Sequence, residues 1–278
     1  MSIPFTTGLN PPRTKLPPGT VDTHHHVYDA RYPLAPGVTR VVADATLADH
    51  ARLRARLGVA RNVIVQPSAY GTDNRLTLAA TAEGGADSRA VVVVAPDTPE
   101  PDLRRMALLG ARGARMNLLS PGAALGVEAM APLGTVLAGL GWHLQIFSSA
   151  DVIAEQAEVL WALPCPVVFD HLAQLPPDGF AGHPAWEVVS GMLAAGRAFV
   201  KLSSPYALAP GRQGPLIKAL VEANPRQVVW GTNWPHPNAV GHVPDDAALV
   251  DLFATHVPPE HHTAVFAENA TRLYGFAA

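Results

Sequence analysis

The chain has 278 residues, of which 48% are hydrophobic and 15% are charged, and its formal net charge is −3. This weakly acidic balance leaves no broad basic surface for nucleic acid. No apolar run approaches the roughly 18 residues that cross a bilayer, and a single cysteine, Cys165, excludes an internal disulfide. The composition therefore predicts a cytoplasmic protein with one large core, without a membrane or nucleic-acid partner.

Eight short runs rich in β-branched residues alternate with segments of helical periodicity. We expect strands at Val21–His26, Asn62–Gln66, Ala90–Ala95, Ala111–Asn117, His143–Phe147, Pro166–Asp170, Ala198–Ser203 and Gln227–Thr232. Helices are expected at Thr46–Leu57, Leu103–Leu109, Asp151–Leu163, Ala185–Ala195, Pro215–Ala223 and Asp246–His256, with a final helix after Pro258. This alternation predicts an α/β fold, a single (β/α)8 TIM barrel over residues 20–278, after an extended arm over residues 1–19. Two open α/β halves are the alternative, although no linker-like stretch divides the chain.

The first expected strand carries three consecutive histidines after Asp22 and Thr23. Because side chains alternate along a strand, Asp22, His24 and His26 should share one face. In TIM-barrel enzymes the active site lies at the carboxyl ends of the strands, so two imidazoles should reach the barrel mouth. Such a pair suits a divalent metal or the polarisation of a carbonyl, and a packed histidine cluster is equally open. His25 faces the other way and should be structural.

Two further motifs follow the sixth and eighth expected strands. The sixth strand ends in Phe-Asp-His at residues 169–171, and residues 230–236 read Trp-Gly-Thr-Asn-Trp-Pro-His. With His24 and His26, these motifs resemble the amidohydrolase superfamily, and within it the metal-independent branch that hydrolyses or isomerises lactones. The loop at residues 65–74 after the second strand also resembles that branch. The resemblance covers residues 20–274 and implies a lactone-converting enzyme.

Asn233 departs from the pattern that this resemblance implies, because most hydrolases of the superfamily carry Asp there as a base or metal ligand. An amide cannot accept a proton near neutral pH and is a poor metal ligand. The lactone isomerases of the branch also carry Asn, and there a substrate hydroxyl would replace water as the nucleophile. Two alternatives remain open: an engineered Asp→Asn change that stalls a hydrolase, and a barrel that binds its ligand without converting it.

A binuclear metal site of this superfamily needs a carbamylated lysine after the fourth strand. The only lysines are Lys15, Lys201 and Lys218, so that class is excluded. In the fifth strand His143 should lie deep, while Gln145 on the same face should lie nearer the mouth and contact substrate. Histidines alone could hold zinc adventitiously. We expect no catalytic metal and no other cofactor.

An anionic substrate needs hydrogen-bond donors at the mouth. Arg115 at the end of the fourth strand is expected to clamp a carboxylate, with a salt bridge at the rim as the alternative. Lys201 and Tyr206 are expected second contacts, although Lys201 could equally form an ion pair inside the barrel. Ser68 and Tyr70 could donate to a carboxylate or hydroxyl, and Tyr70 could instead pack against its loop.

The expected chemistry is attack of an oxygen nucleophile on a lactone carbonyl. His24 and His26 should stabilise the oxyanion, by about 3 to 4 kcal/mol per donor. His171, with an ordinary pKa of about 6.5, should carry the proton, and Asn233 should orient the nucleophile or ring oxygen. The leading hypothesis is hydrolysis of a small carboxylated lactone from sugar-acid or aromatic catabolism, by a chain that could form a homo-oligomer. The remaining histidines are expected at the surface: His50, His183, His242, His256, His261 and His262.

Overall fold

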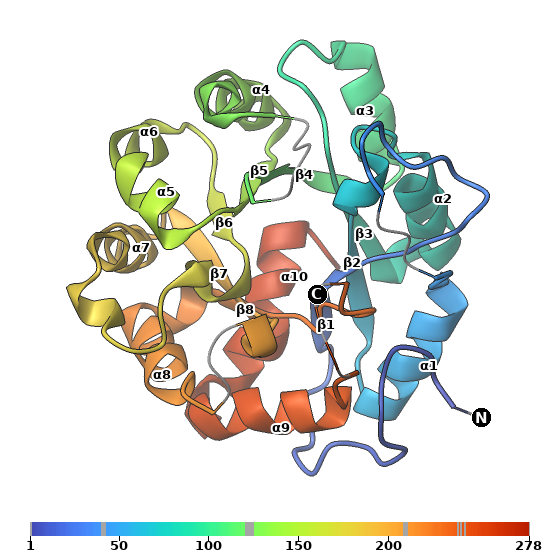
Figure 1. Cartoon of the computed structure of the whole chain (residues 1–278), viewed down its shortest axis with the longest axis vertical. Helices are drawn as coiled ribbons and strands as arrows, with labels where there is room; N and C mark the ends of the chain where they lie inside the picture. Colours follow the sequence, from blue (N-terminus) through green and yellow to red (C-terminus); the bar gives the residue numbers. More distant parts are fainter. Residues whose placement is uncertain are drawn as a thin grey trace.

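Eight parallel strands form one sheet in sequential order. The computed structural model describes residues 2–39, 43–119, 125–207, 211–237, 239, 241 and 243–277. The strands are β1 (Val21–His25), β2 (Arg61–Val65), β3 (Ser88–Val92), β4 (Ala111–Asn117), β5 (His143–Phe147), β6 (Val167–Phe169), β7 (Ala198–Leu202) and β8 (Val228–Trp230). Figure 1 shows them at the centre of the molecule with helices around them. Each expected strand overlaps an observed one, and the predicted (β/α)8 barrel is confirmed.

The first and last strands meet where the barrel closes. The His26 amide donates to the Trp234 carbonyl at 2.8 Å, and the Asn233 amide donates to the His24 carbonyl at 2.7 Å. The Thr23 hydroxyl also donates to the Trp230 carbonyl at 2.8 Å. The segment after β8 is therefore fixed directly beside the histidines of β1.

The helices that connect the strands surround the barrel. They are α1 (Leu47–Leu57), α2 (Arg75–Gly84), α3 (Glu100–Leu108), α4 (Met130–Leu140), α5 (Ala150–Glu155), α6 (Ala157–Ala162), α7 (Pro184–Ala194), α8 (Gly214–Ala223), α9 (Asp246–His256) and α10 (Asn269–Tyr274). The sequence did not predict α2 and α4, which lack a side-chain cap at their first turn. The single helix expected over 151–163 divides at Gln156 into α5 and α6. No helix in the described part of the chain is long and apolar enough to cross a membrane.

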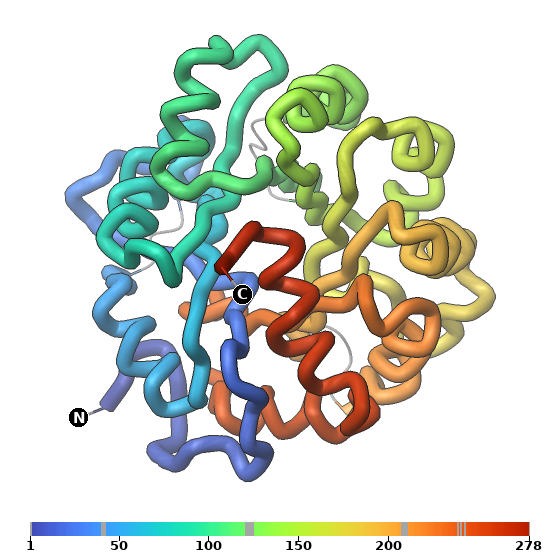
Figure 2. The backbone as a smooth tube through the Cα atoms, turned by 180° about the vertical axis from the view of Figure 1, so that it is seen from behind, coloured from blue at the N-terminus to red at the C-terminus, as the bar shows by residue number. Residues whose placement is uncertain are grey.

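The amino-terminal end of the barrel is closed by the last helix. Tyr274 and Ala270 of α10 pack with Val21 of β1 and with valines of the other strands in one buried cluster. Figure 2, seen from behind, shows this carboxy-terminal segment in red across the middle of the barrel. The functional side chains therefore have to gather at the opposite end, where the strands finish.

The pairing of β1 with β2 contains an irregularity that changes which way the side chains of β1 face. Asp22 pairs with Asn62, yet His25 pairs with Ile64, so β1 has one extra residue between these points. A bulge of this kind interrupts the alternation of side chains along a strand. The expectation that Asp22 shares a face with His24 is wrong for this reason.

The two side chains reach different layers. Asp22 Oδ2 lies 2.8 Å from His50 Nε2 of α1, whereas His24 Nδ1 lies 3.2 Å from Asp170 Oδ1, just after β6. His50 is completely buried, so its expected place at the surface is also wrong. His183, His256, His261 and His262 are partly exposed. His242 lies outside the described residues.

Candidate active site

Asp170, which sequence reasoning did not single out, is the centre of the polar cluster at the strand ends. Its Oδ2 accepts hydrogen bonds from Arg115 Nε at 3.0 Å and Gln145 Nε2 at 3.1 Å. Its Oδ1 lies 3.2 Å from His24 Nδ1 and 3.8 Å from Lys201 Nζ. Burial alone would raise the pKa of Asp170, but the surrounding His24, Arg115 and Lys201 outweigh it and hold that pKa well below its ordinary value. A buried, ionised carboxylate thus organises the cluster.

Lys201 forms hydrogen bonds inside this cluster. Its ammonium donates to the Thr23 carbonyl at 2.8 Å and to Gln145 Oε1 at 2.7 Å, and lies 3.4 Å from His24 Nδ1. An ammonium has three donors; Thr23 and Gln145 use two of them, and the third faces His24 Nδ1 and Asp170 Oδ1. Lys201 is completely buried, and burial lowers its pKa to about 7 although Asp170 opposes the shift. The contacts of Lys201 favour the alternative of an ion pair inside the barrel, and its contact with substrate stays a prediction.

Gln145 and Arg115 also belong to this buried network. Both ends of the Gln145 amide are bonded, to Asp170 and to Lys201, so this side chain positions its neighbours, and its contact with substrate stays a prediction. Arg115 is 4% exposed and gives only its Nε to Asp170 among the hydrogen bonds in the described part of the chain. A guanidinium has five N–H donors, so Arg115 retains donors for an anionic group. Arg115 does form a salt bridge, as in the alternative, but the salt bridge is buried rather than at the rim, and the expected carboxylate clamp stays a prediction.

The tautomer of His26 is fixed by the backbone. His26 Nδ1 lies 2.8 Å from the Val65 carbonyl oxygen, which can only accept, so Nδ1 carries the proton. Burial lowers the pKa of His26 to about 3, which keeps the ring neutral. Its Nε2 then carries a lone pair, so the role of oxyanion donor expected for His26 does not fit this geometry. His26 can instead accept a hydrogen bond.

His24 and His171 lie next to each other, with ring centroids 4.7 Å apart. His24 Nδ1 faces both an acceptor, Asp170, and a donor, Lys201. Its Nε2 is buried without a hydrogen-bond partner among the described residues. This atom can therefore donate in one tautomer and accept in the other. His171 Nδ1 lies 2.7 Å from Ser203 Oγ, and burial lowers the pKa of His171 to about 4.

A left-handed turn after β6 places His171. Four consecutive residues, His171 to Gln174, have positive φ angles of 52°, 59°, 55° and 51°, and each such non-glycine residue costs about 1–3 kcal/mol. The Ala173 amide donates to the Asp170 carbonyl at 3.0 Å, and Gln174 Nε2 donates to the His171 carbonyl at 3.1 Å. No glycine in this segment signals the turn. Packing of the buried Leu172 and Ala173 holds it.

Ser68 and Tyr70 lie in the loop after β2. The Tyr70 hydroxyl accepts from the Asp29 amide at 2.9 Å and donates to the Asp29 carbonyl at 3.1 Å. This pair ties the loop to the segment after β1, so the packing alternative describes Tyr70. Ser68 Oγ accepts a 2.5 Å hydrogen bond from Asn117 Nδ2 at the end of β4. Its own proton remains for a second acceptor.

Asn233 lies just after β8 with a φ angle of +62°, a conformation that Asn and Asp adopt more readily than other residues with a side chain. Its Nδ2 lies 2.6 Å from Ser204 Oγ and 2.8 Å from the Tyr206 hydroxyl. Its Oδ1 is buried and has no hydrogen-bond partner in the described part of the chain. Tyr206 thus contacts the predicted site residue Asn233, and burial raises the pKa of Tyr206 to about 12.

Asp22 connects β1, β8 and α1 outside this cluster. Its Oδ1 accepts from the amides of His24 at 3.1 Å and Thr232 at 2.9 Å, and its Oδ2 accepts from the Thr232 hydroxyl at 2.7 Å. Burial would raise its pKa, but the hydrogen bond and charge of His50 outweigh burial and lower it to about 2. His25 stacks on His50 with ring centroids 3.5 Å apart. Asp22 therefore positions the backbone on both sides of the site.

The barrel, with imidazoles and a buried carboxylate at the carboxyl ends of its strands, defines a TIM-barrel protein with a candidate active site of the amidohydrolase kind. The chain belongs to the amidohydrolase family, whose sequence model matches residues 21–276. The resemblance stated from the motifs is thereby confirmed.

Known relatives share nearly the whole chain. It is 34% identical over 289 residues to a 2-pyrone-4,6-dicarboxylate hydrolase of Comamonas testosteroni, covering 95% of this chain and 92% of the relative. It is 29% identical over 275 residues to a D-galactarolactone isomerase of Agrobacterium fabrum, covering 95% and 93%. The apo crystal structure of an Agrobacterium tumefaciens protein matches with a TM-score of 0.88 at 25% identity, over 98% of this chain and 99% of that one.

Many amidohydrolases use metal ions, and a metal site needs several ligating atoms close together. Within the described residues, one group has metal-ligating atoms within 4.8 Å of one another: His24, Asp170 and His171. Asp170 Oδ2 already faces Arg115, and Asp170 Oδ1 faces Lys201. A divalent metal ion would have to displace these two cations. The strand-eight position offers only the Asn233 amide. This donor set does not fit a catalytic metal.

Proposed function

We propose that the protein is an enzyme that acts on the ester bond of a small carboxylated lactone, with hydrolysis as its main reaction. The observation that carries this proposal is the group of three buried imidazoles, His24, His26 and His171, beside the cationic Arg115. Relatives named as a lactone-type hydrolase and a lactone isomerase support the same bond type. No metal takes part in the proposed reaction.

The proposed roles follow from the tautomers. Arg115 binds the anionic end of the substrate or its developing oxyanion, because it has donors to spare. His24 Nε2 faces the reacting carbonyl, and His26 Nε2 accepts a hydrogen bond from a substrate or water O–H. His171 takes the proton of the nucleophile as its oxygen bonds to the carbonyl carbon. That proton then passes to the ring oxygen when the carbon–oxygen bond of the ring breaks.

Isomerisation is the second candidate, and Asn233 favours it. With an amide in place of a carboxylate, position 233 cannot deprotonate water near neutral pH. A hydroxyl of the substrate could attack the carbonyl instead, and the ring would re-form in another size. One histidine could then both accept and return the proton, so that none is released.

A panel of carboxylated lactones followed by a pH indicator and by NMR separates these reactions. Hydrolysis opens the ring to a free acid and releases one proton per turnover, whereas isomerisation changes the NMR spectrum without releasing acid. A lactone that binds but is recovered unchanged would support the binding-only alternative. Activity lost on chelation, together with one zinc per chain by elemental analysis, would overturn metal independence.

We also propose a reducing cytoplasm as the location of the protein. Cys165 is free and buried, which suits a compartment where thiols stay reduced. Fractionation of the producing cells with an antibody against the chain checks this directly.

A further inference from the structure

A chain of hydrogen bonds runs from α9 to the candidate active site. Asp246 Oδ2 lies 3.2 Å from His236 Nε2, and His236 Nδ1 lies 3.0 Å from the Tyr206 hydroxyl. That hydroxyl lies 2.8 Å from Asn233 Nδ2 and 3.1 Å from Ser204 Oγ. Asp246 and His236 are buried, at 1% and 4% exposed. Neither has a place in the reaction described above.

The direction of each hydrogen bond in this chain follows from its first member. The Asp246 carboxylate accepts from His236 Nε2–H, so in the neutral ring His236 Nδ1 carries the lone pair. The Tyr206 O–H must then donate to Nδ1, which uses its only proton. Its oxygen can only accept from the remaining neighbours, so Asn233 has to present Nδ2–H to it. This assignment comes from the whole network rather than from one contact.

The free atom of Asn233 is consequently its oxygen. Asn233 Oδ1 is buried and unpartnered among the described residues. Its backbone is bonded to the His24 carbonyl at 2.7 Å, so the side chain starts beside the catalytic imidazoles. A buried acceptor without a donor is destabilising, and a ligand hydroxyl that donates to it would remove this cost.

We propose that Asp246, His236 and Tyr206 form a positioning relay that holds the Asn233 amide with Oδ1 free, so that position 233 accepts a hydrogen bond from a substrate hydroxyl. This inference rests on the proposed function and narrows its substrate class to lactones with a free hydroxyl near the reacting carbonyl. Lactones without any hydroxyl leave Oδ1 unpaired.

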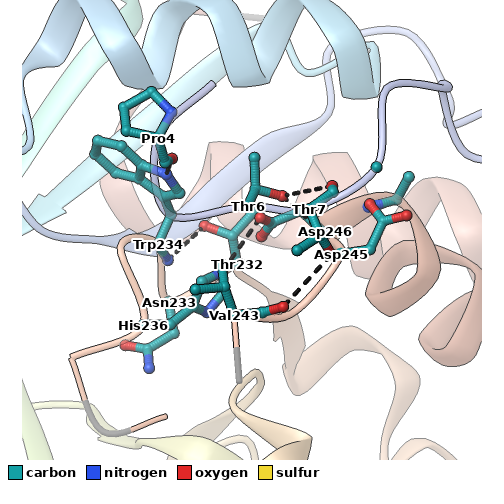
Figure 3. A network of polar contacts seen from close by, with 12 residues as sticks. Pro4, Thr6, Thr7, Thr232, Asn233, Trp234, His236, Val243, Asp245 and Asp246 are labelled. Carbon is teal, nitrogen blue, oxygen red and sulfur yellow. Dashed lines mark hydrogen bonds and ion pairs between the residues drawn. The ribbon is translucent and has the colours of Figure 1, made fainter. Parts of the chain in front are cut away.

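The N-terminal arm holds the relay from its outer side. Thr6 Oγ1 accepts from the Asp246 amide at 3.2 Å, and the Pro4 carbonyl accepts from Trp234 Nε1 at 2.9 Å. Figure 3 shows Thr6 and Thr7 against Asp245 and Asp246, with Trp234 close to Pro4. The arm thus holds the loop that carries Asn233 and His236 at Trp234, and holds α9 at Asp246. This fixes the backbone on which the amide turns.

Neutron diffraction from a deuterated crystal of the full chain tests the relay without any substrate. We expect deuterium on His236 Nε2 and none on Nδ1, and the nitrogen of the Asn233 amide next to Tyr206. Deuterium on His236 Nδ1, or the amide oxygen facing Tyr206, would overturn the proposal. If the arrangement is found but no lactone binds, only the proposed function fails.

The substitution Tyr206→Phe, measured on two compounds, tests the role of the relay in binding. Tyr206→Phe removes one of the two acceptors of the Asn233 amide and releases the Ser204 hydroxyl, which can then either donate to the amide or accept from it. The orientation of the amide is then no longer fixed, so kcat/KM for galactarolactone, which carries hydroxyls, should fall about tenfold, mainly through KM. For 2-pyrone-4,6-dicarboxylate, which carries no hydroxyl, the change should stay below about twofold. Calorimetric binding of both compounds replaces kinetics where turnover is absent. Equal losses on both compounds would indicate a merely structural role and overturn the proposal.

A matched pair at position 236 adds a rescue. His236 has a φ angle of +60°, which Asn and Gly both tolerate. His236→Asn retains an acceptor near Nδ1 and should keep galactarolactone affinity within about threefold, whereas His236→Gly should lose about tenfold. Asp245→Asn is the control, because Asp245 is next to the relay but outside it. This substitution should leave the affinity for galactarolactone unchanged. If His236→Asn binds galactarolactone no more tightly than His236→Gly does, the relay is contradicted.

Discussion

Arg115 Nε lies 3.0 Å from Asp170 Oδ2, and both side chains are buried. Asp170→Asn keeps the shape of this pair but leaves Arg115 and Lys201 without their counter-charge. Removing one partner of a buried ion pair costs about 3–5 kcal/mol, so the melting temperature should fall clearly in calorimetry. The exposed pair of Asp178 and Arg212 supplies the control, since Asp178→Asn should cost less than about 1 kcal/mol. Equal effects of the two substitutions would contradict the central role of Asp170.

The pH dependence of turnover should reflect buried, neutral histidines. Burial lowers the pKa of His171 to about 4. The neutral ring is the form that accepts a proton, so it persists as the pH falls until that pKa is reached. Below pH 6, where Lys201 with its pKa of about 7 stays charged, we expect kcat/KM to stay level down to pH 5 and to fall near pH 4. If the fall of kcat/KM with falling pH has its midpoint near 6.5, the ordinary histidine pKa, a less buried group carries out the proton transfer.

His171→Asn tests the proton carrier. Asn tolerates the positive φ angle at this position and can bond Ser203, so the fold should be retained. Loss of a general acid–base group lowers kcat by about 10²–10⁴-fold, which steady-state kinetics on an active lactone would show. His183→Asn, at a partly exposed position where the new side chain can still cap α7, is the matched control. Unchanged turnover in His171→Asn would sink the assignment.

Asn233→Asp tests the choice between hydrolysis and isomerisation. Asp adopts the φ angle of +62° as readily as Asn, and the Ser204 hydroxyl can donate to the new carboxylate. The variant gains a group that can deprotonate water, so acid release should rise relative to isomerised product. A product ratio that does not move would argue against water activation at this position. Activity gained by an otherwise inert protein would favour the engineered Asp→Asn alternative.

Acid should weaken the contacts by which Asp22 joins β1 to His50 of α1 and to Thr232 after β8. The pKa of Asp22 is lowered from 3.8 to about 2 by His50, against the effect of burial. A lowered carboxyl pKa contributes stability above its unfolded value and loses it as the pH falls through the folded value, here about 2 kcal/mol in total. Urea unfolding at pH 7 and pH 3 should show the gap between the native chain and Asp22→Asn narrowing at the lower pH. A constant gap would contradict this.

Much of the fold could be predicted from the sequence because each strand is a short buried run between turn residues. The helices α2 and α4 could not, since neither has a capping side chain and their apolar residues are not confined to one face. His50 was predictable in principle. It lies three residues from both Leu47 and Leu53, on the buried face of α1.

The site was only partly predictable for a different reason. His24, His171 and Asn233 were found because they stand in motifs, and the structure places them at or just after the carboxyl ends of β1, β6 and β8. Asp170 stands in the same motif as His171, but its importance depends on cations from β4 and β7 that no local pattern relates to it. The tautomer of His26 likewise depends on a carbonyl of β2. Roles of this kind depend on contacts between different strands, which the local sequence pattern does not indicate.

The extra residue in β1 makes the length of that strand matter more than its composition. Before the irregularity, Asp22 reaches the helix layer, and after it His24 reaches the barrel interior. Deleting Thr23 would restore strict alternation and force either the carboxylate inward or the imidazoles outward. Substitutions in this segment can therefore weaken the structure by degrees. A one-residue insertion or deletion should instead abolish both the Asp22 contacts with α1 and β8 and the arrangement of the site histidines.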